Sequence, residues 1–493
     1  MKQTFYDIFS ELNKIPRPSH HESRVAQWLC DFAQKHGLKY RRDDENCVVI
    51  EKPASPGCED AEPVVILNHM DMVCVARDGY ERNGRKFDPL NDEIIPYIDV
   101  DENGTRWMKA EGTSLGADNG FGLSMALAIL ADDTLVHPAL EVLTTTNEED
   151  GMSGAEALSL DFIKGRKIIN LDSEAYDEIT VGAAGAFLQV AHWTPRHDDV
   201  PQGYAYRRIV MDGGLGGHSG VDINKGRCNC NREMAVFLDE ELADGIMAGQ
   251  VAVCAFNGGT ANASIPSCAD VVVALHPDVA DSMAQIVAAR NEDLRARYAA
   301  TDAGINMRIE DAAPCDKCID KATVMNLLGC IPELPCGVIE MRDDMPGTVM
   351  TSNNIGVVRT LDDEITVSCH TRSFSNDDMH EFAEAIEETC LGHLASDVEQ
   401  LMDTGSWMEN PDSPLLQLTC DTFKDVLGFE PKKVAMHFVL EAAYYVEKYP
   451  GVEMASMGPL IIEPHSTSER INLDTADNIW RVTVELLKRL ATK

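Results

Sequence analysis

Hydrophobic residues recur through the N-terminal part of the chain at intervals of three and four positions, the spacing of one helix face. The residues that follow this spacing are Phe5, Ile8, Phe9, Leu12, Val25, Trp28, Leu29 and Phe32. We therefore expect helices from residue 1 to about residue 40.

Short apolar runs with the length of buried strands follow this helical region. They occupy residues 47–50, 64–67, 140–143 and 167–171. A helix is expected between the second and third runs, over residues 119–130, where Phe121 and Leu127 are available for burial. Strands that alternate with helices predict an α/β sheet with helices on both faces.

The pattern changes between about residue 185 and residue 400, where the apolar segments resemble antiparallel strands with one exposed face. The expected strands cover residues 207–211, 251–256, 271–275 and 365–369, and the expected helices lie near 230–240, 279–297 and 377–394. After Pro411 the first pattern returns, with a helix at 415–426, an apolar stretch at 454–462 and a closing helix at 475–490.

The simplest organisation of these elements is an α/β domain built from both ends of the chain, with an α+β domain inserted between them. The predicted boundaries are residues 1–185 and 401–493 for the first domain and 186–400 for the insertion. A chain of 493 residues is too long for one ordinary hydrophobic core, which also favours more than one domain.

The charge balance argues against two classes of partner. Asp and Glu number 82 against 42 Lys and Arg, a net charge of −40. Nucleic acid requires a basic surface and anionic lipid attracts basic segments, so we expect neither. Charges interrupt every apolar window of about 18 residues, and the N-terminus lacks the apolar core of a signal peptide. The 15 cysteines show no disulfide framework, which predicts a cytoplasmic protein.

Acidic and histidine side chains follow several of the predicted strands. Glu148, Glu149 and Asp150 come directly after the run at 140–143, although neighbouring carboxylates repel one another unless a cation or solvent intervenes. An isolated acidic triplet is usually a solvated loop. Four further clusters contain His69 with Asp71, Asp118, Asp172 and His465. Ligands gather at the carboxyl ends of strands in open α/β sheets, so we expect all five clusters to meet in one crevice.

Imidazole and carboxylate ligands suit zinc, with cobalt or manganese as possible substitutes. A two-metal site needs about three protein groups per ion and one shared carboxylate. The count is complete if Asp118 bridges, with His69 and Asp172 on one ion and Glu149 and His465 on the other. Asp71 can then accept a hydrogen bond from the free ring nitrogen of His69. Glu148 remains available as the base that deprotonates water.

The ordered motifs HMD, GADNG, NEED, LDSE and PHS together resemble the di-zinc metallopeptidase family that includes carboxypeptidase G, peptidase T and the cytosolic dipeptidases. The segments GTSLGADNGFG, GGLGGHSGVDI, GGTANASIP, TSNNIG and NPDSPLL are most similar to its aminoacyl-histidine dipeptidase branch. The resemblance implies a mixed-sheet α/β di-metal peptidase domain with an inserted α+β lid domain. It also implies the five metal ligands, Asp71 and the general base Glu148 as assigned above.

Three residues of the predicted lid acquire roles from this resemblance. His218 resembles the family histidine that donates to the scissile carbonyl, and Arg372 resembles the arginine that binds the substrate carboxylate. Without the resemblance, His218 would be a surface histidine in a flexible glycine loop, and Arg372 an ordinary surface arginine. Asn262 is a candidate polar contact to substrate, with a turn role equally compatible.

Two positions differ from the branch pattern. Glu463 stands where relatives have Gly, and an added carboxylate near the metals could weaken their effect on the pKa of water. The segment expected as HAGLECG reads HFVLEAA and keeps only His437, Leu440 and Glu441, of which Glu441 is a candidate substrate-binding residue. Both differences leave the amino-acid preference open.

These features predict a metal-dependent dipeptidase that cleaves small dipeptides, either Xaa-His or a broader set. An N-acyl amino acid deacylase with the same site is the alternative enzyme. A catalytically silent binding protein is the alternative from another class, although it would be expected to lose a ligand or the base. A homodimer is possible, in which a second subunit would supply the lid residues.

Overall fold

The computed structural model describes residues 4–492, and these form two compact units. Unit 1 contains the described residues up to Gly182, together with Trp407–Ala435 and Glu441 onward, and unit 2 contains Ala183–Ser406 and Met436–Leu440. Residues 1–3 and 493 of the predicted α/β domain lie outside the described part. The short segment Met436–Leu440 belongs to unit 2, whereas the predicted boundaries place it in the α/β domain.

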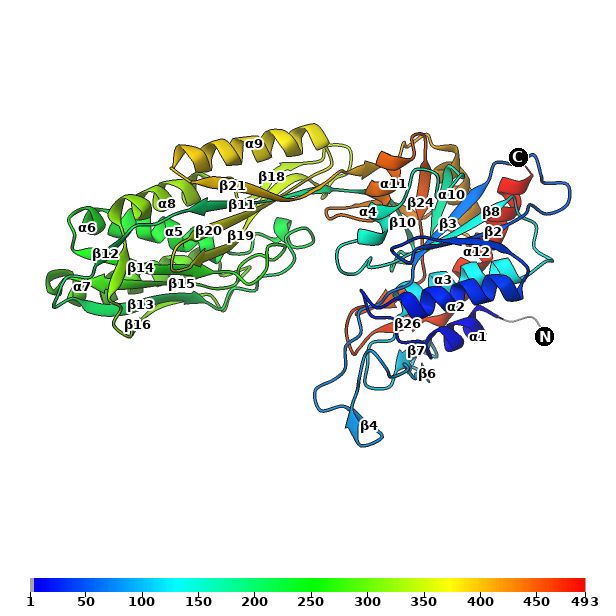
Figure 1. Ribbon diagram of the computed structural model, residues 1–493, viewed down its shortest axis with the longest axis horizontal. Coiled ribbons are helices and arrows are strands. Elements are labelled where there is room, and N and C mark those ends of the chain that lie inside the picture. Colours follow the sequence, from blue (N-terminus) through cyan, green and yellow to red (C-terminus); the bar gives the residue numbers. More distant parts are fainter. Residues whose placement is uncertain (1–3, 493) are drawn as a thin grey trace. The chain divides into compact units, whose positions relative to one another are not determined.

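Unit 1 is built around a mixed sheet with the strand order β1-β2-β8-β3-β9-β24-β10-β22, and β23 pairs with β10 (Figure 1). Its strands are β1 (Lys39–Arg42), β2 (Val48–Lys52), β3 (Val64–His69), β8 (Leu140–Thr145), β9 (Lys167–Asn170), β10 (Glu178–Ala183), β22 (Trp407–Met408), β23 (Lys432–Met436) and β24 (Glu453–Ser456). The four adjacent strands β8, β3, β9 and β24 are parallel, and β2 and β10 pair with them antiparallel. The predicted mixed-sheet α/β class is confirmed.

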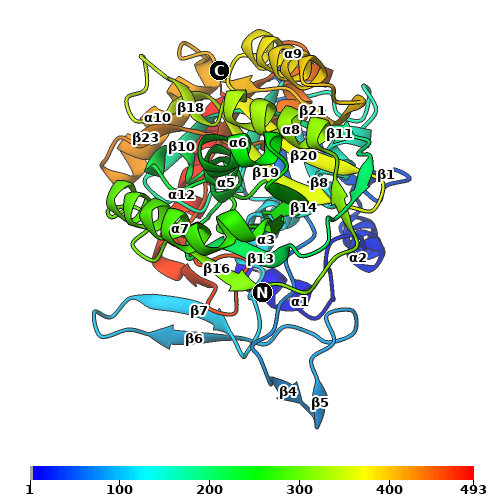
Figure 2. The same ribbon diagram turned by 90° about the vertical axis from the view of Figure 1, so that its left-hand side faces the viewer.

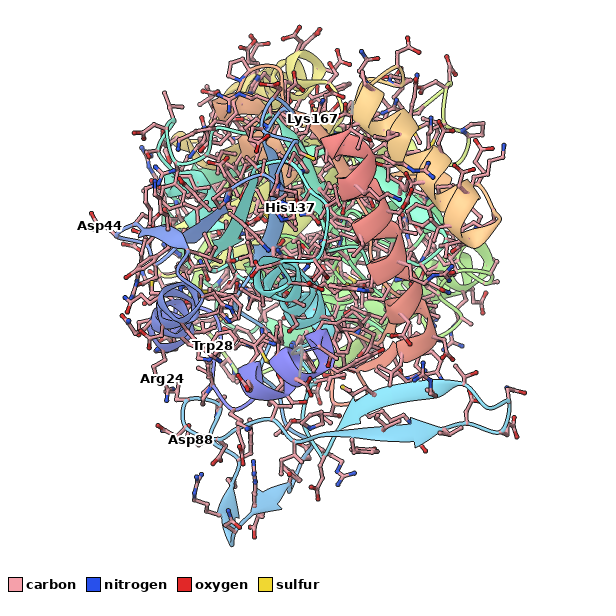
Figure 3. The ribbon with its side chains drawn as sticks, turned by 90° about the vertical axis from the view of Figure 1, so that its right-hand side faces the viewer. Arg24, Trp28, Asp44, Asp88, His137 and Lys167 are labelled. Atoms are coloured by element: carbon pink, nitrogen blue, oxygen red, sulfur yellow. The ribbon has the colours of Figure 1, made fainter. Side chains whose placement is uncertain are left out.

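The helices of unit 1 are α1 (Phe5–Leu12), α2 (Ser23–Lys35), α3 (Ala117–Ala131), α4 (Ser153–Ala157), α10 (Pro414–Leu427), α11 (Ala442–Lys448) and α12 (Leu473–Ala491). All of these except α4 and α11 agree with the helices predicted from hydrophobic periodicity. Helix α2, which carries Arg24 and Trp28 in Figure 3, contacts β1 and β2, while α3 packs on β3 and α10 on β24. Helix α3 is buried nearly all round, as its apolar sequence requires.

One part of unit 1 has no counterpart in the sequence-based prediction. The strands concerned are β4 (Glu81–Arg82), β5 (Arg85–Lys86), β6 (Pro96–Val100), β7 (Arg106–Ala110), β25 (Ile461–Ile462) and β26 (Arg470–Asn472). Strands β4 to β7 project from the rest of the unit (Figure 2). Four of the five residues of β6 are exposed, so the strand lacks the apolar alternation on which the prediction depends.

Unit 2 contains one antiparallel sheet with the order β16-β13-β15-β14-β19-β20-β11-β21, and β18 pairs with β19. Its strands are β11 (Gly185–Trp193), β13 (Ala205–Asp212), β14 (Val251–Gly258), β15 (Ala269–Leu275), β16 (Asn306–Asp311), β18 (Gly337–Met341), β19 (Val349–Thr360), β20 (Ile365–Ser373) and β21 (Asp397–Thr404), with β12 (His197–Asp199) and β17 (Lys317–Ile319) forming a separate pair. The core lies between this sheet and helices α5 (Cys230–Phe237), α6 (Ala243–Met247), α7 (Pro277–Arg297), α8 (Lys321–Glu333) and α9 (Asn376–Gly392) (Figure 2).

The sheet of unit 2 consists of two halves with the same topology. One half runs β11-α8-β19-β20-α9-β21, and the other runs β13-α5-β14-β15-α7-β16 within the connection from β11 to α8. Both follow the order strand, helix, strand, strand, helix, strand, and they join antiparallel through β14 and β19. Unit 2 is therefore an internally repeated α+β unit.

No helix within residues 4–492 is both long enough and apolar enough to cross a lipid bilayer.

Candidate metal centre and active site

The ends of three parallel strands bring acidic and histidine side chains to one edge of the unit 1 sheet. His69 is the last residue of β3, Asp172 follows β9 by two positions, and Glu149 follows β8 by four. Strands β8, β3 and β9 are adjacent and parallel, so their carboxyl ends lie together. The crevice expected from the sequence therefore has a structural basis in strand order.

Asp118 and His465 complete the cluster from outside the sheet. Asp118 lies at the start of α3, and His465 lies in the loop between β25 and β26. One oxygen of Asp118, Oδ1, lies 3.1 Å from His69 Nε2, and the other, Oδ2, lies 3.2 Å from His465 Nε2. Asp172 Oδ1 is 3.3 Å from His69 Nε2, and Glu149 Oε2 is 2.7 Å from His465 Nε2. The five side chains thus form two groups of three that share Asp118.

The carboxylates of the cluster favour the protonated, positively charged form of both histidines. Hydrogen bonds to Asp118 and Glu149 raise the pKa of His465 to about 11. Burial opposes protonation of His69, yet its pKa is raised well above the usual value by the carboxylates of Asp172 and Asp118. The only ion pairs that Asp118, Glu149 and Asp172 make within residues 4–492 are with these two histidines.

The donor set fits two divalent metal ions. It offers two imidazole nitrogens and three carboxylates, a combination that zinc, cobalt and manganese accept. His69, Asp118 and Glu149 present ligand atoms within 4.8 Å of one another. In addition, Glu149 Oε1 is buried without a hydrogen-bond partner, an unsatisfied acceptor that a cation would satisfy.

Asp71 fixes the orientation of His69 and of the backbone at Glu148 and Glu149. His69 Nδ1 lies 3.1 Å from the Asp71 carbonyl oxygen and 3.5 Å from its carboxylate Oδ1, so the backbone is the closer acceptor. The fully buried carboxylate of Asp71 also accepts hydrogen bonds from Ser19 Oγ at 2.8 Å and from the backbone N–H groups of Glu148 at 3.1 Å and Glu149 at 3.2 Å. Asp71 therefore positions both the histidine and the acidic segment.

Glu148 lies outside the two groups of three and is strongly perturbed. Burial raises its pKa well above the usual value, the nearby His69 lowers it, and Asp172 and Glu441 raise it further. Glu441 is 4% exposed, and burial raises its pKa to about 8. The Tyr445 hydroxyl donates to Glu441 Oε2 at 3.4 Å, while Glu441 Oε1 has no partner.

Two side chains that the sequence analysis did not select hold the loop that carries Asp118. The buried Glu469 accepts hydrogen bonds from the backbone N–H groups of Leu115 at 2.6 Å, Gly116 at 2.9 Å and Ala117 at 2.7 Å. The buried Arg17 donates to the carbonyl oxygens of Gly116, Asp71 and Met70 at 2.7, 3.0 and 3.1 Å. Glu469 lies four residues after His465, whereas Arg17 lies near none of the motifs.

The unusual Glu463 forms an ion pair with Arg470, and its side chain is 55% exposed. Its negative charge is therefore balanced by a neighbouring guanidinium, which reduces its influence on the metal-facing groups. A second acid that the sequence analysis did not select, Glu174, joins Asp118 and His465 in a set of ligand atoms within 4.8 Å of one another.

The predicted lid residues lie in unit 2. Arg372 on β20 is 4% exposed, so the interpretation as a surface arginine is wrong. Its Nε donates to Ser219 Oγ at 3.4 Å, and no carboxylate within residues 4–492 forms an ion pair with it. Burial and the charge of Arg372 lower the pKa of His218 to about 4 and that of His437 to about 3. Unit 2 therefore carries a buried cation beside two neutral imidazoles.

His370 and Asn262 also lie in unit 2. His370 on β20 is buried with neither ring nitrogen hydrogen-bonded, and burial together with Arg372 lowers its pKa. Asn262 lies in a loop, and its backbone carbonyl oxygen accepts a hydrogen bond from Asn354 Nδ2 at 3.2 Å. This contact is consistent with the turn role. His437 shares a 2.8 Å hydrogen bond with Ser352 Oγ.

Comparison with known proteins gives similarity along the full chain. Residues 65–490 match the model of peptidase family M20/M25/M40. The chain is 33% identical over 498 residues to the cytosol non-specific dipeptidase of Escherichia coli (strain K12), covering 100% of this chain and 98% of that protein.

Solved structures give a consistent result. The crystal structure of aminoacylhistidine dipeptidase from Vibrio alginolyticus has 32% sequence identity and a TM-score of 0.85, covering 98% of this chain and 96% of that one. A tripeptidase from Staphylococcus aureus has 15% identity and a TM-score of 0.59, covering 100% of this chain and 99% of that one, and it shows the shared fold alone.

The buried imidazole of His437 predicts a pH-dependent stability of unit 2. Folding lowers the pKa of His437 from 6.5 to about 3. Between these two pH values the imidazole is protonated in the unfolded chain and neutral in the folded unit. The free energy of unfolding should therefore decrease as the pH drops through this window, by a few kcal/mol (about 1.4 kcal/mol per pKa unit). Denaturant midpoints between about pH 4 and pH 7 should fall less steeply for His437→Gln than for wild type.

His380→Gln is the matched control, because the His380 side chain is 46% exposed in the same unit. It should keep the wild-type slope. Identical slopes for wild type and His437→Gln would contradict the prediction.

Proposed function

The chain belongs to the M20/M25/M40 peptidase family, and from this premise we propose that it is a cytoplasmic dipeptidase that uses two divalent metal ions. The observation that carries the proposal is the pair of three-residue groups that share Asp118. The names of the relatives from Escherichia coli and Vibrio alginolyticus support dipeptides as substrates. All 15 cysteines are free thiols, and the first of these relatives is named as a cytosol enzyme, which supports the location.

We assign His69 and Asp172 to one ion, Glu149 and His465 to the other, and Asp118 to both. Two zinc ions held there, or cobalt or manganese in their place, would lower the pKa of water and polarise the scissile carbonyl. Asp71 keeps His69 in one orientation through the contact to its Nδ1, so the Nε2 atom faces the cluster.

Glu148 is the proposed general base. Its carboxylate takes the proton from the attacking water and returns it to the leaving amine nitrogen. Burial raises its affinity for that proton, because the charged form is desolvated. The hydrogen bond from its backbone N–H to Asp71 holds it beside the metal-facing residues without making it one of them.

The two charged ends of a dipeptide match two buried charges of the protein. Glu441 in unit 1 has a buried oxygen without a partner, which suits the α-ammonium group of the substrate. Arg372 in unit 2 lacks a carboxylate partner, which suits the substrate carboxylate, and His218 is the proposed donor to the scissile carbonyl oxygen.

An N-acyl amino acid carries no α-ammonium group, so Glu441 favours a dipeptidase over the alternative deacylase. A panel of dipeptides, including Xaa-His, assayed beside N-acyl amino acids tests this choice. Preferred hydrolysis of the N-acyl series would replace the proposal with a deacylase, and no hydrolysis of either series would favour a silent binding protein.

Removal of metal should abolish hydrolysis. Treatment with a chelator, followed by zinc, cobalt or manganese, should first eliminate dipeptide cleavage and then restore it, because the proposed reaction depends on a lowered pKa of water. Full activity in a sample that elemental analysis shows to be free of metal would disprove the proposed mechanism.

The two adjacent glutamates should respond differently to loss of charge. Glu148→Gln should nearly abolish turnover and leave metal content close to that of wild type, because it removes a base rather than a ligand. Glu149→Gln should lower metal occupancy. Elemental analysis combined with steady-state kinetics checks both, and the reverse pattern would exchange the two assignments.

Substitutions of His218 and Arg372 in unit 2 should affect kcat and KM differently. His218→Ala should lower mainly kcat, by roughly 10²–10³-fold, the usual effect of losing an oxyanion donor. Arg372→Ala should mainly raise KM for dipeptides with a free carboxylate and much less for C-terminal amides. Metal content should not change in either variant.

Arg207→Ala is the control for the loss of an arginine from unit 2, because Arg207 pairs with the exposed Asp311. Wild-type kcat in His218→Ala, or an equal effect of Arg372→Ala on dipeptides and their amides, would show that these roles are wrong.

A further inference from the structure

Glu174 adds a carboxylate to only one of the two proposed metal positions. Its ligand atom lies within 4.8 Å of those of Asp118 and His465, and all three atoms lie within this distance of one another. Asp172, two residues earlier, instead lies 3.3 Å from His69. The segment after β9 therefore supplies one acid to each side of the shared Asp118.

The backbone around Glu174 is held closely in place. The Glu174 carbonyl oxygen accepts a hydrogen bond from the Ile461 N–H at 2.9 Å. A Cβ atom added to Gly458 would lie 1.6 Å from the carbonyl oxygen of Ser173, so the two chain segments approach as closely as glycine permits. Rigid elements of this kind are what a metal ligand requires from its surroundings.

A second observation also points to a cation beside His465. The Glu149 side chain is 4% exposed and contacts His465 Nε2 through Oε2 at 2.7 Å, while its Oε1 atom is buried without a hydrogen-bond partner. No Lys or Arg within residues 4–492 forms an ion pair with Glu149, and the same holds for Glu174. Carboxylate oxygens therefore converge on this position with His465 as their partner and without a lysine or arginine to neutralise them.

The two positions consequently differ in chemistry. The His69 position has one imidazole and the carboxylates of Asp118 and Asp172, which suits four-coordinate zinc completed by water. The His465 position has one imidazole and the carboxylates of Asp118, Glu149 and Glu174. Additional oxygen donors raise the affinity for a harder ion with a higher coordination number, such as manganese, relative to zinc.

We propose that Glu174 is a ligand of the second metal ion and raises the affinity of the His465 position for manganese relative to zinc. This inference rests on the proposed two-metal function and adds a difference between the two positions. Glu463, the other acid that adjoins His465, is paired with Arg470 and has no part in this effect on affinity.

Competition between metals tests the role of Glu174. Metal-free protein is equilibrated with manganese in large excess over zinc, because zinc binds most nitrogen and oxygen sites more tightly, and the bound ions are counted by elemental analysis. Wild type should bind two ions, with manganese concentrated at one of the two positions. Glu174→Gln should lower the ratio of manganese to zinc by about tenfold while still binding two ions. Glu463→Gln should keep the wild-type ratio, and Glu174→Asp should recover part of it.

A spectroscopic measurement separates ligation from a general effect of charge. In the protein loaded with cobalt, loss of an oxygen ligand should increase the visible absorption, because cobalt absorbs more strongly as its coordination number falls. An unchanged metal ratio and an unchanged cobalt spectrum in Glu174→Gln would overturn the inference.

The outcomes also separate this inference from the proposed function. Wild-type protein that hydrolyses dipeptides with two bound ions, together with an unaltered Glu174→Gln variant, would overturn the role of Glu174 alone. Wild-type protein that hydrolyses dipeptides without any metal would overturn both.

Discussion

The backbone of Gly116 is held by two buried ionic side chains, one at its N–H group and one at its carbonyl oxygen. The arrangement of the acidic cluster depends on these contacts. Glu469 accepts from the Gly116 N–H, and Arg17 donates to the Gly116 carbonyl oxygen. Arg17 also binds the backbone that follows His69, so one guanidinium connects the end of β3 with the start of α3. Buried charges are costly unless they are hydrogen-bonded, so these bonds to Glu469 and from Arg17 make the connection specific.

The charge distribution of the protein corresponds to the charge distribution of a short peptide. Unit 1 buries carboxylates, including the partly unsatisfied Glu441, and unit 2 buries the guanidinium of Arg372 beside neutral histidines. A zwitterion carries an ammonium group and a carboxylate a fixed number of bonds apart. The proposed recognition of both ends by Glu441 and Arg372 would therefore limit the length of the substrate in a way that recognition of one end does not.

The sequence predicts those features of this structure that depend on local pattern. Helix α3 and strands β3, β8 and β9 follow directly from apolar periodicity, and the metal-facing residues follow from their positions after those strands. Strand β6 escapes prediction because its residues are exposed. The repeat within unit 2 also escapes it, because the two halves share topology without a recognisable shared sequence motif.

Long-range partners explain the remaining differences between prediction and structure. Glu469 and Glu174 are acids in short loops, and nothing local distinguishes them from solvated carboxylates until Gly116, Asp118 and His465 are brought near. The charge of Glu463 is balanced by Arg470, which depends on the conformation of the loop between them. Hydrophobic patterning determines the elements, whereas these contacts depend on how the elements meet.

The position of β24 in the sheet has a consequence for synthesis on the ribosome. This strand inserts between β9 and β10, yet it is translated more than two hundred residues after both, at Glu453–Ser456. Nascent unit 1 therefore has a vacant strand position while all the strands of unit 2 emerge and pair. Unpaired strand edges of this kind are prone to aggregation. The segment that closes this vacancy is followed in the chain by His465 and Glu469, so the acidic cluster stays incomplete until the chain has emerged beyond Glu469.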